Sequence, residues 1–129
     1  MISTDLALAL RDAGLSWHPA SGDRFQLDEP EFEADVFTVS EMTIEPRKYP
    51  TGVILAFNGT TEWALDSLPK EDVLWLPRED QLRVLLGERF VALERQDDTW
   101  VVTYRTAEGN RRTQATDVED AYALAVLGA

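Results

Sequence analysis

The chain has 129 residues, of which 44% are hydrophobic and 28% charged, as is typical of one globular domain. It contains no cysteine, which excludes disulfides, thiolate metal sites and cysteine nucleophiles. Its 24 acidic and 12 basic side chains give a formal net charge of −12. Such a charge repels phosphate backbones, so we expect no nucleic-acid partner.

Residues 3–15 predict a first helix, because Ser3 or Thr4 can cap its start and Gly14 can end it in the left-handed conformation. Three apolar side chains fall on one stripe of this helix: Leu6, Leu10 and Ala13. The N-terminus lacks the basic region of a signal peptide, and no segment approaches the roughly 20 apolar residues of a membrane span. We therefore expect a cytoplasmic protein without a membrane partner.

The next segments predict short extended pieces joined by loops. Residues 24–27 follow a turn with Pro19, Ser21 and Gly22 and predict a short strand. Residues 28–35 contain five acids and a proline, which favours an exposed loop. Residues 36–45 are rich in β-branched side chains and predict an extended segment, whereas residues 46–52 predict a connector.

Residues 53–65 predict a β-hairpin, because Asn58-Gly59 between two apolar runs is the strongest short signal for a two-residue turn. This turn places Leu55 opposite Glu62. Asn58 is thereby explained by backbone geometry, and the pattern does not indicate an active-site loop.

A second helix is predicted within residues 68–90. Pro77 suits its first turn, and Glu79 and Asp80 suit its positively polarised start. Three leucines form its buried stripe: Leu82, Leu85 and Leu86.

Residues 90–116 predict three antiparallel strands, with turns at Asp97-Asp98 and at Glu108-Gly109-Asn110. The first turn sets three cross-strand pairs: Val91–Tyr104, Leu93–Val102 and Arg95–Trp100. The last pair brings a guanidinium close enough to an indole for a cation–π contact.

The chain closes with a third predicted helix, which a Thr116-x-x-Glu119 capping box begins. Its predicted buried side chains are Val118, Ala121, Tyr122 and Ala125. Together these elements predict an α+β fold in which helices pack on one side of an antiparallel sheet, with a C-terminal β-β-β-α unit. We expect one domain over residues 1–129.

The segments WLPREDQLRVLL, WVVTY and TDVEDAYALA resemble a group of small uncharacterised bacterial and prophage-associated proteins. In that group a Leu-Pro-x-x-Asp-Gln-Leu helix precedes three strands and a final Glu-x-Ala helix. The resemblance covers roughly the last 60 residues, and DAGLSWHPASGDRF is similar to the front of some members. Some members of the group carry a pilus-assembly name that resembles the name of a P-loop ATPase. This sequence has no G-x-x-x-x-G-K-[S/T] and no other glycine-rich phosphate cradle, and we expect no cofactor.

The candidates for catalysis are few. His18 is the only histidine, whereas a catalytic zinc site needs about three protein ligands, so we expect no metal. Glu62, if covered, would have a raised pKa suited to a general acid, with Asp66 or Glu41 as a second carboxylate. That hypothesis requires Glu62 and Glu41 to lie within about 5–10 Å across one cleft.

Partner binding is the alternative for the remaining conspicuous side chains. The acid loop, Asp28, Glu29, Glu31, Glu33 and Asp35, suits a basic partner or solvent, and lacks the spacing of an EF-hand. Trp17 and Trp75 lie near prolines and are expected to be partly exposed contact residues. We therefore favour a non-enzymatic protein–protein interaction or regulatory module of a bacterial cytoplasm, with a basic partner or self-association. A carboxylate-based or weakly metal-assisted hydrolase and a prophage-type acidic inhibitor remain alternatives.

Overall fold

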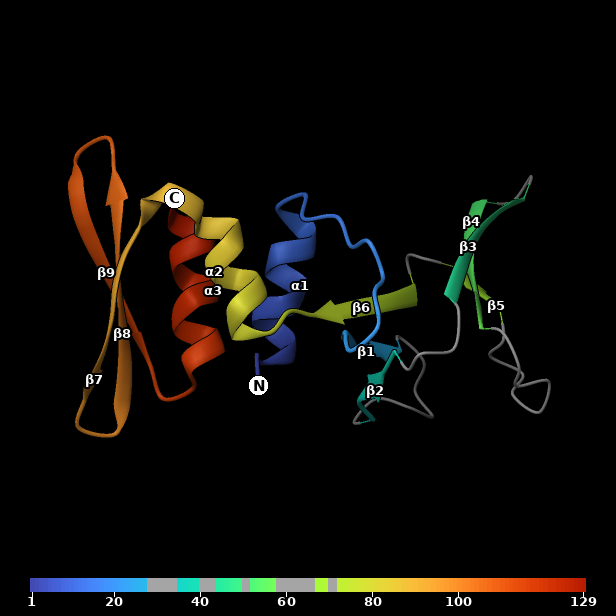
Figure 1. Cartoon of the computed structure of the whole chain (residues 1–129), viewed down its shortest axis with the longest axis horizontal. Helices are drawn as coiled ribbons and strands as arrows, with labels where there is room; N and C mark the ends of the chain where they lie inside the picture. The colour runs from blue at the N-terminus through green and yellow to red at the C-terminus, as the bar shows by residue number, and fades with distance from the viewer. Residues whose placement is uncertain (28–34, 40–43, 50–51, 58–66, 70–71) are drawn as a thin grey trace. The chain divides into compact units, whose positions relative to one another are not determined.

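The computed structural model describes residues 1–27, 35–39, 44–49, 52–57, 67–69 and 72–129 (Figure 1). Its helices and strands confirm the α+β class. The chain folds into two compact units: unit 1 contains Met1–Ser16 and Leu76–Ala129, and unit 2 contains Trp17–Trp75. Unit 2 is therefore an insertion within the sequence of unit 1. The single domain expected over residues 1–129 stays a prediction.

Unit 1 begins with α1, Thr4–Asp12, which confirms the first predicted helix. The Ser3 hydroxyl oxygen accepts a hydrogen bond from the Leu6 amide at 3.4 Å, and Gly14 has a φ of +100° beyond the helix end. The predicted stripe was wrong in part, because Ala13 is exposed at the C-cap and Ala7 is buried together with Leu10. The helix ends at Asp12, one residue before the last position of the predicted stripe.

The second helix, α2, spans Glu79–Leu86 and is followed by a 3-10 turn, η3, at Gly87–Arg89. The Gln81 side-chain oxygen accepts a hydrogen bond from the Arg78 amide at 2.9 Å, so Arg78 is the N-cap. Pro77 therefore precedes the cap and does not lie in the first turn as predicted. Of the predicted leucine stripe, Leu82 and Leu86 are fully buried and Leu85 is half-buried.

Three strands follow in unit 1: β7 Phe90–Gln96, β8 Thr99–Thr106 and β9 Gly109–Ala115. They form an antiparallel sheet in the order β7-β8-β9. Leu93 lies opposite Val102, and the Arg95 guanidinium lies 5.3 Å from the centre of the Trp100 ring, as predicted.

Two details of the predicted register were wrong. Phe90, and not Val91, lies opposite Tyr104, because a β-bulge falls between Phe90 and Ala92. Thr106 pairs with Gly109, so the second turn consists of residues 107–108. A bulge adds one residue to one strand, which the alternation of side chains does not reveal.

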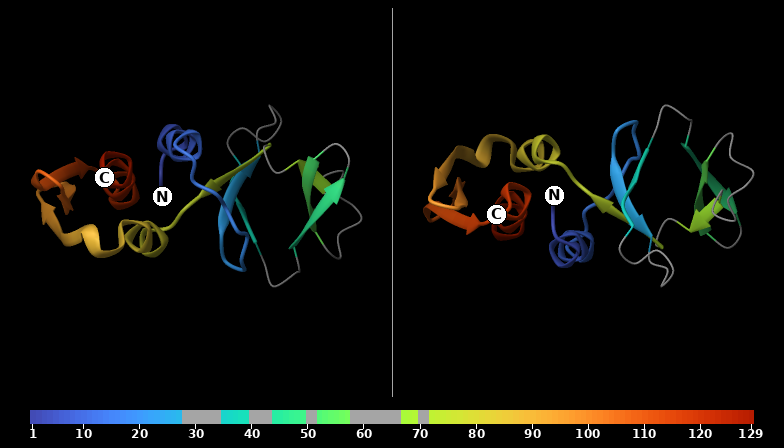
Figure 2. Two further views of the ribbon diagram at one scale, coloured as in Figure 1. Left: turned by 90° about the horizontal axis from the view of Figure 1, so that it is seen from above. Right: turned by 90° about the horizontal axis from the view of Figure 1, so that it is seen from below.

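The last helix, α3, spans Val118–Gly128 and packs on one face of this sheet. Figure 2 shows α3 lying between the sheet and α1. The Asp117 carboxylate accepts a hydrogen bond from the Glu119 amide at 3.1 Å, so Asp117 is the N-cap. The capping box predicted from Thr116 to Glu119 was therefore wrong, although the β-β-β-α unit was confirmed.

The end of α3 approaches Tyr104 so closely that glycine is required. A Cβ atom added at Gly128 would lie 2.5 Å from the Tyr104 hydroxyl oxygen, whereas the next ring atom, Cζ, is 3.4 Å away. Gly128→Ala is therefore expected to lower the free energy of unfolding by about 1 kcal/mol, measured by urea denaturation. In the Tyr104→Phe background the same change is expected to be neutral or stabilising, because alanine favours the helix. An equal loss in both backgrounds would contradict the clash with the hydroxyl.

Unit 2 contains two small sheets. One has the order β2-β1-β6, with β1 Arg24–Leu27, β2 Phe37–Thr38 and β6 Val73–Leu76, whose last residue belongs to unit 1. The other has the order β3-β4-β5, with β3 Ile44–Tyr49, β4 Gly52–Phe57 and β5 Ser67–Pro69. Strand β1 was predicted, whereas the connector expected at residues 46–52 was wrong. Tyr49 pairs with Gly52, so most of that segment belongs to the paired strands β3 and β4.

The predicted register of the Asn58-Gly59 hairpin was also wrong. Leu55 lies opposite Leu68 of β5 and not opposite Glu62. The residues from 58 to 66, which include the predicted turn, lie outside the described part of the chain. Strand β4 is thus paired on both sides, by β3 and by β5.

Candidate interaction surface

Most of the proposed catalytic residues lie outside the described residues: Glu41, Glu62 and Asp66. His18 is exposed in the segment between α1 and β1. Within the described residues, no group of three His, Cys, Asp or Glu side chains is placed to hold a metal ion. The carboxylate pair of the hydrolase hypothesis therefore stays a prediction.

The predicted acid loop is described only at its end, where Asp35 is exposed. The other four acids, Asp28, Glu29, Glu31 and Glu33, lie outside the described residues. The exposure expected for the tryptophans was wrong for Trp17, which is only 5% exposed. Trp75 lies in β6, half-buried, with its ring stacked on Trp17 at 6.4 Å between centroids and 8° between planes.

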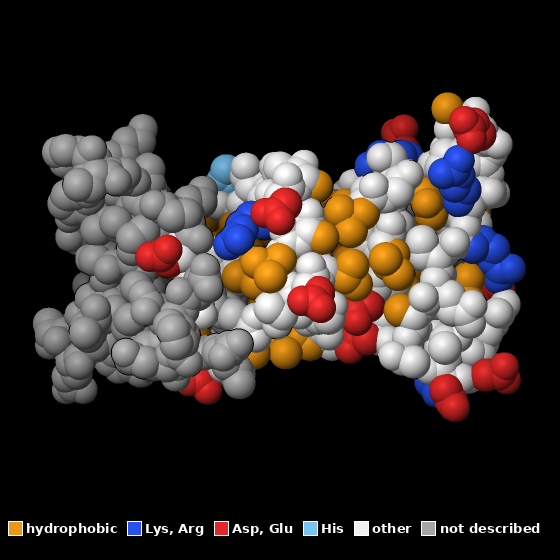
Figure 3. Space-filling model, turned by 180° about the vertical axis from the view of Figure 1, so that it is seen from behind, with side chains coloured by type: hydrophobic (Ala, Val, Ile, Leu, Met, Phe, Trp, Pro, Cys, Tyr) orange, Lys and Arg blue, Asp and Glu red, His pale blue; other side chains and the backbone are white. Residues whose placement is uncertain are grey.

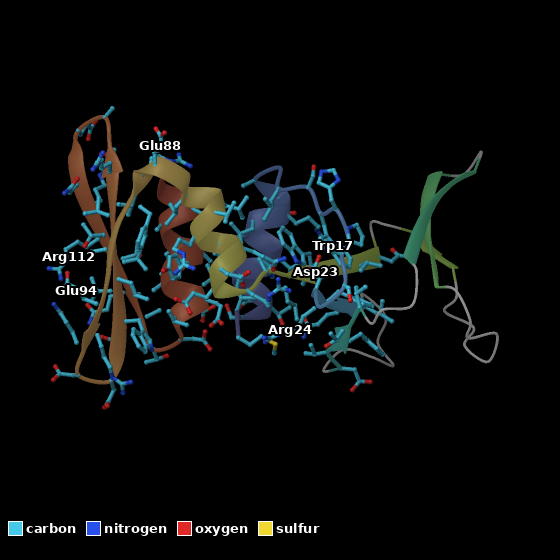
Figure 4. The ribbon with its side chains drawn as sticks, in the orientation of Figure 1. Trp17, Asp23, Arg24, Glu88, Glu94 and Arg112 are labelled. Atoms are coloured by element: carbon cyan, nitrogen blue, oxygen red, sulfur yellow. The ribbon has the colours of Figure 1, made fainter. Side chains whose placement is uncertain are left out.

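Asp23 explains why Trp17 is buried. The Asp23 carboxylate is 2% exposed, and its Oδ2 accepts hydrogen bonds from the Trp17 indole at 2.9 Å and the Ala20 amide at 3.0 Å (Figure 4). A buried indole N–H is costly unless it has such a partner. Phe25 and Phe37 continue the aromatic cluster, with 5.5 Å between their ring centroids. This cluster is the core of unit 2 and not a contact surface.

In unit 1, α3 leaves two leucines exposed on the same side. Leu124 is 38% exposed and Leu127 is 37% exposed, whereas Ala121, Tyr122 and Ala125 are fully buried. A spacing of three residues puts Leu124 and Leu127 next to each other on a helix surface. Figure 3 shows the side of unit 1 on which apolar side chains gather over the helices, with acidic side chains among them.

The acidic side chains of unit 1 are unevenly distributed. Helices α1 and α3 with their N-caps carry one base, Arg11, and five acids: Asp5, Asp12, Asp117, Glu119 and Asp120. The rest of unit 1 carries seven acids and seven bases. Among these side chains, Arg78 forms an ion pair with Asp80, and Arg111 forms one with Glu108. The acidic excess of unit 1 therefore lies entirely on the two helices.

The starts of α1 and α3 lie side by side. The Ser3 amide donates a hydrogen bond to Asp120 Oδ1 at 2.7 Å. The Met1 ammonium lies 2.8 Å from Asp117 and 3.3 Å from Glu119, so two carboxylates share one cation.

Burial and the neighbouring Asp117 raise the pKa of Glu119. Burial also works to raise the pKa of Asp117, but hydrogen bonds with Glu119 and the ammonium outweigh it and lower that pKa.

We call these two leucines and five acids the α1–α3 face. The sequence did contain a signal for it: residues 121–127 of α3, AYALAVL, are all apolar. A helix without a polar side must be covered all round or leave an apolar stripe in water. By contrast, Glu94 and Arg112 point away from α3 on the far side of the sheet (Figure 4).

No helix in the described part of the chain is long and apolar enough to cross a membrane. The sequence matches no protein-family model, and no curated protein or solved structure is significantly similar to it. The resemblance to small prophage-associated proteins therefore stays a prediction. The function of the chain has to be inferred from its own side chains.

Proposed function

We propose that this chain is a non-enzymatic protein–protein interaction module that binds its partner through the α1–α3 face. The observation that supports it is the exposure of Leu124 and Leu127 on a helix whose opposite side is fully buried. Adjacent exposed leucines with a charged border are typical of protein–protein contact sites. Each leucine has somewhat more than a third of its surface left to bury, which contributes about 0.5–1 kcal/mol per leucine on binding, so two leucines together matter measurably.

The position of the leucines also separates this proposal from the acidic-inhibitor alternative. A mimic of nucleic acid needs a regular stripe of acids facing a basic groove. Here Leu124 and Leu127 continue the side of α3 on which Asp120 lies, at positions i+4 and i+7. An apolar stripe that begins at an acid favours a protein partner with both apolar and basic side chains.

The test compares two variants of the full chain in quantitative capture of proteins from its own cells. Leu124→Ser/Leu127→Ser is expected to reduce the bound partner at least tenfold, because it removes the apolar contact. Val84→Ser is the matched control, since Val84 is 77% exposed on α2 and lies outside the α1–α3 face. Circular dichroism melting curves should confirm that both variants stay folded. Equal capture by wild type and the double-serine variant would contradict the proposal.

A further inference from the structure

The two helices of the α1–α3 face run in the same direction. Their starts are joined by the Ser3–Asp120 hydrogen bond, and the two helices are in contact with each other. Figure 1 shows both of them rising from the same end of unit 1. Two parallel helices offer a long, shallow surface on which a third helix packs by placing its side-chain ridges in their grooves. The leucines at three-residue spacing lie along that direction and match apolar anchors at positions i, i+3 or i+4 of a partner helix.

The charge of the face specifies the partner further. The excess of four acids over bases in unit 1 is located entirely on α1 and α3 with their N-caps. At the start of α3, the Asp117 and Glu119 carboxylates share one ammonium group, which leaves the pair with a net negative charge. A second copy of this chain in a symmetric contact would bring the same acids together and be repelled. A basic segment is attracted instead, and its lysines or arginines can pair with acids on both helices.

We infer that the partner docks a basic amphipathic helix along the α1–α3 face, with apolar side chains on Leu124 and Leu127 and basic side chains beside the acids. This inference rests on the proposed function, because it names the partner of that same surface. Its distinguishing consequence is a dependence on salt. Raising the salt concentration screens the charge pairs at the rim and weakens binding, while the leucine contact remains.

The probe for the experiment is a synthetic peptide of about 18 residues, five helical turns, with leucine on one side and lysine on the other. A second peptide carries glutamate in place of every lysine. Each is titrated into the isotope-labelled full chain, and amide chemical shifts locate the binding site. We expect the lysine peptide to shift amides of α1 and α3 selectively, and the glutamate peptide to cause no change.

Two pairs of variants separate the apolar and charged contributions. Leu124→Ser/Leu127→Ser is expected to weaken the lysine peptide at least tenfold, and Val84→Ser less than twofold. Asp5→Asn/Asp120→Asn is expected to weaken it about threefold to tenfold. Its matched control, Asp97→Asn/Asp98→Asn, makes the same change of charge in the β7–β8 turn and should have little effect. Asparagine at position 120 still offers an oxygen to the Ser3 amide, so the start of α1 is retained.

The outcomes distinguish this inference from the proposed function. If the leucine variants lose a natural partner but the lysine peptide does not bind α1 and α3, the basic helix is wrong and the interaction face stands. If the peptide binds, but equally well to the double-serine variant, both ideas are overturned. If the wild-type chain forms a dimer that Leu124→Ser/Leu127→Ser abolishes, a second copy covers the face and the basic helix is again wrong.

Discussion

Replacement of Asp23 by alanine is expected to destabilise unit 2 by about 2–3 kcal/mol. The Asp23 carboxylate is buried and is the hydrogen-bond acceptor for the Trp17 indole N–H. Without it, this N–H is left buried with no partner, which costs about 1–3 kcal/mol, and the Ala20 amide loses its partner as well. The loss should be measured by hydrogen exchange of the β1 amides, which report on unit 2 separately from α3.

Asp23→Asn is the matched control for this prediction. Oδ2 of Asp23 accepts both hydrogen bonds, and the single carbonyl oxygen of asparagine can take its place. We therefore expect Asp23→Asn to keep most of the stability, with an indole resonance of Trp17 at nearly its original position. If asparagine destabilises unit 2 as much as alanine does, the negative charge of Asp23 matters more than its position as an acceptor.

A second large effect is expected at Tyr122, the largest of the fully buried side chains among the described residues. Its ring stacks on Phe90 with 5.9 Å between centroids, where α3 meets the sheet. Tyr122→Ala removes this contact and leaves a cavity, so it should lower the free energy of unfolding by about 3–5 kcal/mol. Urea denaturation followed by circular dichroism at helical wavelengths would measure this loss.

The hydroxyl of Tyr122 contributes much less than its ring. Among the described residues it has no hydrogen-bond partner, although Glu79 and Arg83 of α2 lie near it. Burial, with the charge of Glu79, raises the pKa of Tyr122, and the charge of Arg83 offsets this only partly. Tyr122→Phe is therefore expected to change stability by less than about 1 kcal/mol, with either sign. A larger loss would reveal a hydrogen bond from the hydroxyl to Glu79.

The elements that could be predicted are those whose causes lie within a few residues. The turn at Asp97-Asp98, where Asp97 has a φ of +53°, sets the pairing of β7 with β8, because a two-residue loop leaves little choice of register. The helix starts were predicted within two residues. Their exact caps were wrong where two side chains could serve, as at Thr116 and Asp117.

Pairing between distant segments was not predictable in the same way. Asn58-Gly59 suggested that β4 pairs with the next few residues, yet Leu55 lies opposite Leu68. The observed register places Leu55 opposite another leucine, whereas the local turn would have placed it opposite a glutamate. Local turn propensity is worth about a kilocalorie, which tertiary contacts readily override.

The sequence by itself determined the α+β class, the β-β-β-α unit and the absence of thiol chemistry, because periodicity, turns and composition are local properties. Only the tertiary structure decided which apolar side chains meet water. Asp23 supplies a partner for the buried Trp17 indole N–H, and β6 brings Trp75 against the Trp17 ring from far along the chain, a contact that no neighbouring residue signals. Leu124 and Leu127 are exposed because α1, α2 and the sheet cover α3 incompletely. Residues 121–127 of α3 are all apolar and have no polar side of their own to mark where water lies, so the packing partners of α3 decide which part of this segment is left for another protein.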